Sequence, residues 1–240
     1  MLGRFFEFEV SEQENYDLRL PTFDEHLLNA ISYYNMAANV YLEFKQPHLA
    51  SGVCLEVGNA LRAAGKRSEA LGYFLQAAEI ESKFPLSHLL ACQAVVECYV
   101  DLGDHEMALN TLTEMGQSLE EQGGEQPAFF EMQSDVEVTS LLILLLLEYP
   151  KAHLKTEHRK IMLKFSPDND DVGSCVHSGS DAENDRRLLL QSLVLAMEMK
   201  HFESLKETET QLSKYLNKTQ ADILHHIVFT SRNRFNLGTS

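Results

Sequence analysis

The chain has 240 residues, of which 44% are apolar and 23% are charged, a composition typical of globular proteins. That length allows one large domain or two small ones. The formal net charge of −16 argues against nucleic acid as a partner, because an acidic surface repels phosphate backbones, and it favours a basic protein partner instead.

The N-terminus shows no targeting signal. Residues 1–15 are apolar for only a few positions and then turn acidic, so they have neither the apolar core of a signal peptide nor the Arg-rich character of a transit peptide. The four cysteines, Cys54, Cys92, Cys98 and Cys175, include no CxxC pair, and reduced thiols are expected. We therefore expect a cytoplasmic protein, with a nuclear pool left open.

Helical spacing of apolar residues dominates the sequence, and no alternating strand pattern occurs in it. Residues 1–23 are expected to be irregular or a partial helix. Residues 24–122 are expected to form helical repeats, with predicted helices over 24–44, 48–64, 67–82, 86–101 and 105–121. The second and third of these form one pair around a Gly65-Lys66 turn, and the last two form another around a Gly103-Asp104 turn.

The two helix pairs repeat with a period of 38 residues, which is the separation of Gly65 and Gly103. Their order of small and large residues resembles the tetratricopeptide pattern, in which small residues let antiparallel helices approach closely and large ones fill the groove beside them. We predict an all-α, tetratricopeptide-like α-solenoid of antiparallel helix pairs. The predicted packing positions are Gly58, Leu61, Ala70, Phe74, Ala77, Tyr99, Ala108 and Leu112.

An apolar helix pair is predicted over residues 134–165, after a Gly/Pro-containing linker at 123–133. Residues 141–147 are apolar without a break. A bilayer span needs ~20 such residues, so a membrane span is excluded. The Ser134–Glu137 capping box is predicted to start the first helix, and Pro150 to end it. A helix that is apolar on every side must be covered on every side, either by its own chain or by a partner.

The remainder of the chain alternates polar and helical segments. Residues 166–184 are rich in Ser, Asp, Asn and Gly and are expected to be an acidic disordered loop. Residues 185–232 are predicted to hold the C-terminal helices, over 185–200, 202–216 and 219–231. Residues 233–240 are expected to fray.

The sequence contains no arrangement of residues that predicts catalysis, a cofactor or a metal site. His225 and His226 are adjacent, so on a helix they point about 100° apart and cannot share one metal ion. The loop that begins at Asp168 has Val172 and Gly179 where an EF-hand needs oxygen ligands. Cys92 and Cys98 are interpreted as buried structural thiols. We therefore expect a protein that is not an enzyme.

Three blocks of sequence resemble the huntingtin-associated protein family encoded within factor VIII intron 22. They are residues 61–81, 134–147 and 188–206, the last continuing to 223–228, and the resemblance covers most of residues 5–230. Against the family pattern the chain is shortened at its N-terminus and lacks the leading helices. The short linker at 120–130 stands in place of the family's Pro-rich insert.

The resemblance implies a non-enzymatic α-solenoid held in the cleft between the HEAT-repeat domains of huntingtin, largely by apolar contacts. It also implies a link to the small GTPase Rab5 and to early-endosome movement. On this interpretation Leu141, Leu142, Leu144 and Leu145 contact huntingtin. The alternative for this leucine helix is that it belongs to the chain's own core.

Two further alternatives stay open. Glu203 and Glu207 either contact a basic patch on huntingtin or lie on an ordinary solvated face. The protein as a whole could instead be a generic tetratricopeptide-type adaptor that binds peptide segments in a groove. That function needs exposed polar residues along the groove, and Asn39, Asn59 and Arg62 are the only candidates.

Overall fold

The structure is a computed structural model, and it describes residues 23–122, 127–149, 154–166 and 181–237. Within these ranges every regular element is helical and no strand occurs, so the predicted all-α class is confirmed. Several predictions lie outside the described residues. They concern residues 1–22, residues 123–126 of the linker, residues 167–180 of the acidic loop, and residues 238–240 of the tail.

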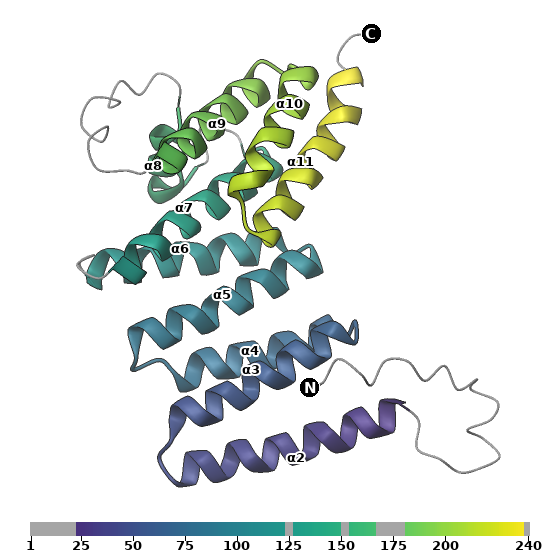
Figure 1. Cartoon of the computed structure of the whole chain (residues 1–240), viewed down its shortest axis with the longest axis vertical. Coiled ribbons are helices and arrows are strands. Elements are labelled where there is room, and N and C mark those ends of the chain that lie inside the picture. The colour runs from purple at the N-terminus through teal and green to yellow at the C-terminus, as the bar shows by residue number, and fades with distance from the viewer. Residues whose placement is uncertain (1–22, 123–126, 150–153, 167–180, 238–240) are drawn as a thin grey trace, which may run out of the picture. The chain divides into compact units, whose positions relative to one another are not determined.

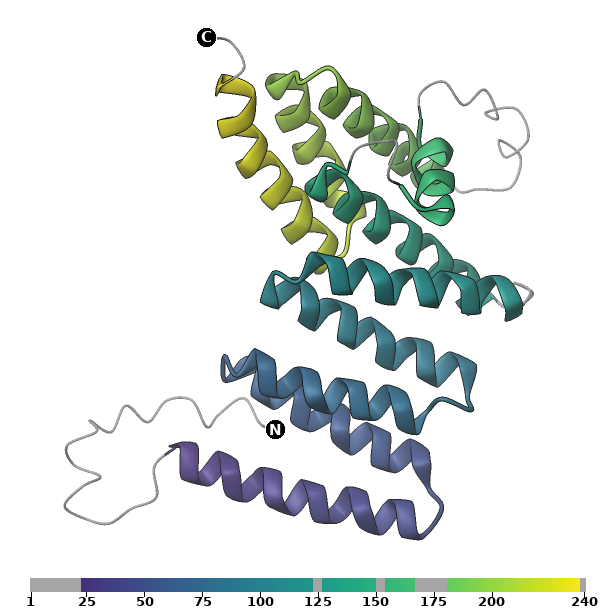
Figure 2. The ribbon, with the colours of Figure 1, turned by 180° about the vertical axis from the view of Figure 1, so that it is seen from behind.

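The chain divides into two compact units, Met1–Ala91 (unit 1) and Cys92–Ser240 (unit 2). The division falls inside one predicted repeat, within helix α5 (Pro85–Leu102). In unit 1, α3 (Pro47–Ala63) packs against both α2 (Phe23–Glu43) and α4 (Arg67–Ile80), as Figures 1 and 2 show. These helices begin and end within about two residues of the predicted ones.

A close approach of α3 to α4 depends on Gly58. A Cβ atom placed on this residue would lie 2.5 Å from Cε1 of Phe74, which is buried in the facing helix. No side chain larger than hydrogen fits there without displacing the phenylalanine ring. The predicted pairing of a small residue with a large one therefore describes the contact between these two helices.

Glycine also shapes the turn inside each predicted pair. Gly65 and Gly103 both have φ of +78°, which costs little without a Cβ. At the first turn, the Lys66 N–H donates to the Leu61 carbonyl (2.9 Å) and the Gly65 N–H to the Arg62 carbonyl (3.1 Å). This pair of bonds is the Schellman motif, and it satisfies carbonyl groups that the helix end leaves free.

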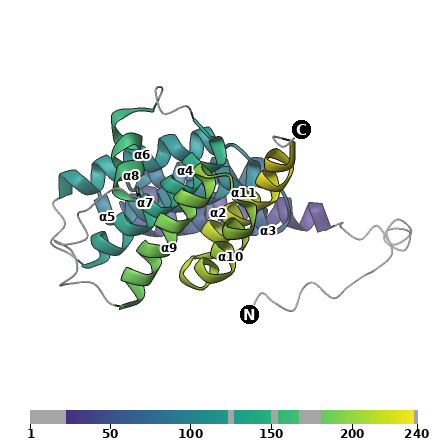
Figure 3. The same ribbon diagram turned by 90° about the horizontal axis from the view of Figure 1, so that it is seen from above.

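Unit 2 contains the rest of α5 and the helices that follow it. α7 packs against α6, α8 and α11, while α9 packs on α10 and α10 on α11. Figure 3 shows α9, α10 and α11 side by side. The bounds are α6 (His105–Gln122), α7 (Pro127–Leu147), α8 (Thr156–Lys164), α9 (Asp181–Glu198), α10 (Phe202–Leu212), the 3-10 turn η3 (Ser213–Tyr215) and α11 (Lys218–Leu237).

The start of α7 corrects the predicted linker and capping box. α7 begins at Pro127, where the fixed φ of proline suits the first helical turn, so residues 127–133 are helical. Ser134 and Glu137 therefore lie inside the helix, and the Glu137 carboxylate accepts a hydrogen bond from the Gln133 amide one turn earlier (3.2 Å). α9 also begins before the predicted position, at Asp181, and α11 runs on to Leu237.

None of the described helices combines the length and the apolarity of a bilayer span. α7 has 21 residues, which at ~1.5 Å each would be long enough. Its first half, however, carries Glu131, Asp135 and Glu137. The predicted absence of a span therefore rests on composition rather than on helix length.

Candidate protein-interaction surfaces

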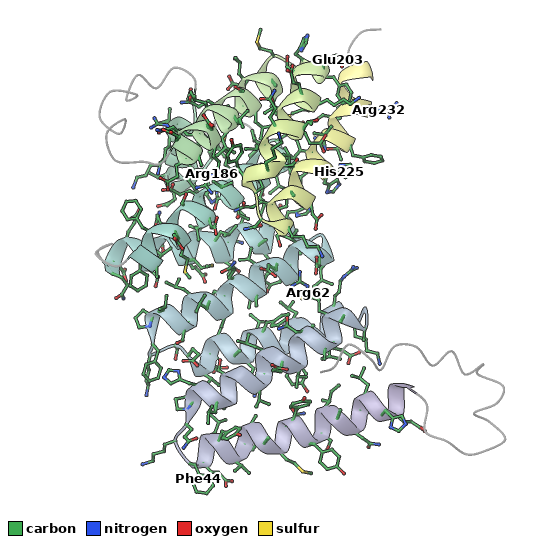
Figure 4. All side chains as sticks on the ribbon, viewed as in Figure 1. Phe44, Arg62, Arg186, Glu203, His225 and Arg232 are labelled. Carbon is green, nitrogen blue, oxygen red and sulfur yellow. The ribbon has the colours of Figure 1, made fainter. Side chains whose placement is uncertain are left out.

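The outer side of α2 carries a row of exposed large apolar residues. Tyr33, Met36, Val40 and Phe44, here called the α2 stripe, have exposed fractions of 72%, 60%, 47% and 72%. Their spacing of three and four residues puts Tyr33, Met36 and Val40 on one side of the helix. Phe44 directly follows the last residue of α2, and its N–H still donates to the Val40 carbonyl (3.0 Å), which continues the row. The opposite side faces the core through Ala38, which is buried. Figure 4 shows Phe44 on the side of α2 that faces away from α3.

A helix with apolar residues on two sides is suited to a position between two neighbours, and α2 has α3 on one side. Single exposed apolar residues are normal, but four aligned ones, two of them aromatic and one methionine, match the composition of protein interfaces. The α2 stripe is the strongest candidate contact surface in unit 1.

Sequence reasoning missed this stripe because it predicted a helix over residues 24–44 without asking which of its sides are apolar. The signal was present in the spacing of Tyr33, Met36, Val40 and Phe44. Finding the stripe requires separating these four residues from the other apolar row of the helix, which includes Ala38.

The structure corrects the assignment of the leucine helix to a partner surface. Leu141, Leu142, Leu144 and Leu145 are 0–7% exposed. They are covered by the neighbours of α7 within unit 2, namely α6, α8 and α11. These leucines form core, as the alternative interpretation held, because three helices of the same chain surround them.

The eight predicted packing positions are all buried. Gly58, Leu61, Ala70, Phe74 and Ala77 have buried side chains or backbone in unit 1. Tyr99, Ala108 and Leu112 are buried in unit 2. They are part of the helix packing and not of any exposed site.

Glu203 and Glu207 lie on the exposed side of α10, and Figure 4 labels Glu203. The other side of the helix faces the core through Leu205, Thr208 and Leu212. The Gln211 amide donates a hydrogen bond to Glu207 (3.4 Å). Both carboxylates are accessible to a partner, and their contact with a basic patch remains a prediction.

A polar groove lies between α2 and α4 in unit 1. It has a volume of about 680 Å³, including the part open to solvent, and the Asn35 amide donates to the Tyr73 hydroxyl across it (3.1 Å). Of the three residues considered for an adaptor, Asn39 lines this groove, while Asn59 and Arg62 do not. The lining residues are Asn35, Ala38, Asn39, Glu69, Gly72, Tyr73 and Gln76.

No group of three His, Cys, Asp or Glu residues in the described ranges could hold a metal ion. Cys54, Cys92 and Cys98 are buried and form no disulfide bond. Burial, with a smaller contribution from Glu114, raises the pKa of the Cys92 thiol to about 11. A thiol with that pKa stays protonated at neutral pH and is a poor nucleophile. Cys175 and the EF-hand-like loop lie outside the described residues.

The adjacent histidines have different neighbours, in agreement with their angular separation. His225 Nδ1 lies 3.0 Å from Oε1 of Glu209 on α10. The His226 ring lies 5.9 Å from the ring of His105 at the start of α6. Burial lowers the pKa of His105, the neighbouring His226 lowers it further, and Asp104 acts in the opposite direction.

Comparison with known proteins gives two curated relatives, and no family model matches the chain. The chain is 28% identical over 260 residues to the 40-kDa huntingtin-associated protein of Rattus norvegicus, and 29% identical to that of Mus musculus. Each alignment covers 86% of this chain and 68% of the relative. The chain is therefore a relative of the 40-kDa huntingtin-associated proteins.

Proposed function

We propose that this chain is a non-enzymatic, huntingtin-binding helical protein and that the α2 stripe forms part of the contact. The relatives, named for their association with huntingtin, align over 86% of the chain. The structural observation that supports the proposal is the α2 stripe, in which Tyr33 and Phe44 are each 72% exposed. Aromatic side chains of this kind provide much of the binding energy at protein interfaces.

A large partner suits this surface better than a second copy of the chain does. Two copies packed through α2 alone would bury only one helix face each. Stable interfaces bury ~800 Å² on each partner, which is more than one such face supplies. Each copy also has a net charge of −16, so two copies repel one another. A larger protein can cover the α2 stripe and reach further surfaces of the chain at the same time.

The experiment is co-expression of the chain with huntingtin, followed by size-exclusion chromatography of the mixture and of the chain alone. The native chain is expected to co-elute with huntingtin. Phe44→Glu places a charge in the stripe and should weaken binding by at least ~30-fold, the effect of losing a hot-spot residue. Because Phe44 is so exposed, the change should leave the stability of unit 1 nearly unaltered.

Phe130→Glu is the matched control. Phe130 lies on α7 in unit 2 and is also 72% exposed, so this variant introduces the same charge at an equally exposed aromatic residue. It should bind huntingtin like the native chain. Equal binding by Phe44→Glu would remove α2 from the contact, and a native chain that elutes apart from huntingtin would remove the function itself.

The proposal extends to a cytoplasmic location with early-endosome association and a link to Rab5, and it leaves a nuclear pool open. Only the family resemblance supports this part. A tagged chain is expected on Rab5-positive vesicles in cells that contain huntingtin, and to leave them when huntingtin is depleted. A vesicle signal that survives depletion would separate the location from huntingtin, and no vesicle signal in either case would remove it.

A further inference from the structure

We propose that the groove between α2 and α4 binds an extended polypeptide segment that carries a basic side chain. The site lies wholly within unit 1 and differs from the α2 stripe, since it uses another side of α2. The proposal goes beyond huntingtin binding and does not depend on it.

The first observation is a glycine that the chain's own packing does not explain. Gly72 lies inside α4, where glycine lowers helix stability relative to alanine. A Cβ atom on Gly72 would meet nothing within 4 Å, in contrast to Gly58, whose Cβ would collide with Phe74. Gly72 instead lines the groove, next to Tyr73. Close approach of a ligand to the α4 backbone would account for the missing side chain.

The second observation is that carboxamide side chains line both walls of the groove. Asn35 and Asn39 on α2 are one helical turn apart, and Gln76 lies on the α4 wall. Each carboxamide offers a donor and an acceptor, as a peptide group does, and Asn35 keeps its oxygen and a second N–H after donating to Tyr73. One turn of four residues rises ~6 Å, and two residues of an extended chain span ~6.6 Å. Successive carboxamides on α2 can therefore pair with alternate peptide groups of an extended segment.

These groups favour an extended ligand over a helical one. Inside a helix the backbone N–H and C=O groups already bond to one another and are not free for side-chain carboxamides. An extended segment leaves them free, and each must find a partner once it is removed from water.

The charge of the groove favours a basic side chain on the ligand. Glu69 is the charged residue of the lining, and no Lys or Arg belongs to it. A phosphate or carboxylate ligand would lack a countercharge there, whereas a Lys or Arg side chain can pair with Glu69. This charge pattern disfavours an acidic peptide as the ligand of the groove.

The test begins with a phage-displayed library of random 12-residue peptides selected on the full chain. Selected peptides are then synthesised with a fluorescent label, and their affinities are measured by anisotropy. Peptides with a Lys or Arg residue are expected to be enriched. Gly72→Leu, which places a side chain in the groove, should weaken binding at least ~10-fold, while Gly72→Ala should have a smaller effect.

Stability measurements separate a blocked groove from a misfolded one. Gly72→Ala and Gly72→Leu should each raise the melting temperature of the chain, by about 2–4 °C if the helix gain is near its usual size. A variant that is more stable but no longer binds the peptides can only have lost the groove. Selected peptides that bind Gly72→Leu as well as the native chain would overturn the proposal, as would a selection that yields no binding peptide.

Glu69→Lys and Glu79→Lys form a matched pair for the charge. Both glutamates are exposed on α4 and both variants change the net charge equally, but only Glu69 lines the groove. Glu69→Lys should weaken peptide binding at least ~10-fold at low salt, and Glu79→Lys should not. Equal losses from both variants would attribute the binding to the overall charge and overturn the site.

Discussion

A single backbone conformation recurs at the ends of several helices. Lys45 and Lys200 have φ of 57° and 53°, the left-handed region that Gly65 and Gly103 also occupy. After Lys200, the His201 N–H donates to the Ala196 carbonyl (3.0 Å). The Asp104 N–H donates to the Tyr99 carbonyl in the same way (2.9 Å). The turn is therefore the same, although a residue that carries a Cβ atom is disfavoured in this region.

This comparison predicts that Lys200→Gly stabilises the protein. Removing the Cβ relieves left-handed strain, and the more flexible unfolded chain offsets part of the gain, so the free energy of unfolding should rise by about 0.5–1 kcal/mol. Gly103→Ala should lower it by about 1 kcal/mol for the reverse reason. Both residues lie in unit 2, so urea unfolding of the two variants reports on one unit.

A fall in stability for Lys200→Gly similar to that of Gly103→Ala would contradict the argument. It would mean that the lysine side chain makes contacts that outweigh the backbone strain.

At the scale of the helices, α8 is attached to α6 through a buried histidine. His158 is buried, and its Nε2 atom lies 3.0 Å from the Thr113 hydroxyl. That hydroxyl donates its hydrogen to the Leu109 carbonyl (2.7 Å), so its oxygen accepts from a hydrogen on Nε2 of the histidine. Burial lowers the pKa of His158, Lys155 lowers it further, and Glu157 partly opposes them.

The lowered pKa of His158 predicts a loss of stability in acid. The unfolded chain, with a histidine pKa near 6.5, binds a proton more readily than the folded chain does. The contribution of neutral His158 is therefore complete above pH 6.5 and decreases as the pH falls from 6.5 toward the pKa of the folded state. His105, whose pKa is also lowered, acts in the same direction.

His158→Gln tests this expectation, because glutamine supplies an N–H donor that does not titrate. The free energy of unfolding should fall less between pH 7.5 and pH 5 in this variant than in the native chain. Carboxylates titrate in both proteins, so the difference between them isolates His158. Identical pH dependence in the two proteins would show that His158 is not the titrating group.

The helix starts of α7 and α11 show that neighbouring start signals compete. Ser134–Glu137 fits a capping box, but α7 starts upstream at Pro127. The motif therefore lies inside the helix. A capping box does form at the start of α11. There the Gln220 N–H donates to Asn217 (2.9 Å) and the Asn217 N–H donates to Gln220 (3.2 Å). A motif identifies where a cap fits, whereas competition between neighbouring starts decides which one is used.

At the scale of the whole molecule, negative charge is unevenly distributed along the chain. Twelve Asp and Glu residues occur between Lys83 and Lys151, with no Lys or Arg among them. Some of these acids are paired with later residues, such as Glu148 with Arg234 (2.8 Å). The excess that remains favours a basic surface on any protein partner, and steers association most strongly at low ionic strength.

The double variant Glu203→Lys/Glu207→Lys tests a local contact against this background. If the two carboxylates meet a basic patch on huntingtin, binding should weaken about tenfold at low salt and less at high salt, where the charges are screened. Affinity is measured by titration against huntingtin at two salt concentrations.

Glu120→Lys/Glu121→Lys is the control for that variant, because it changes the net charge by the same amount on the exposed end of α6. Equal weakening by both double variants would assign the effect to overall charge. Unchanged affinity of Glu203→Lys/Glu207→Lys at low salt would remove the contact.

The sequence by itself determined the helices of residues 24–122, the turn glycines Gly65 and Gly103, and Gly58 and Phe74 as packing positions. These features depend on residues within a few positions of one another or on a simple repeat, so a linear pattern contains them. The start of α7 was not determined in this way, since several local starts compete.

Only the tertiary structure decided which apolar surfaces are covered. It buried Leu141 and Leu142 among helices of the same chain and left Phe44 exposed, although both regions are strongly apolar in sequence. It also brought Asn35 and Gly72, which are 37 positions apart in the chain, to one groove. Burial and convergence depend on contacts between distant segments, and the periodicity of a single helix contains no information about its neighbours.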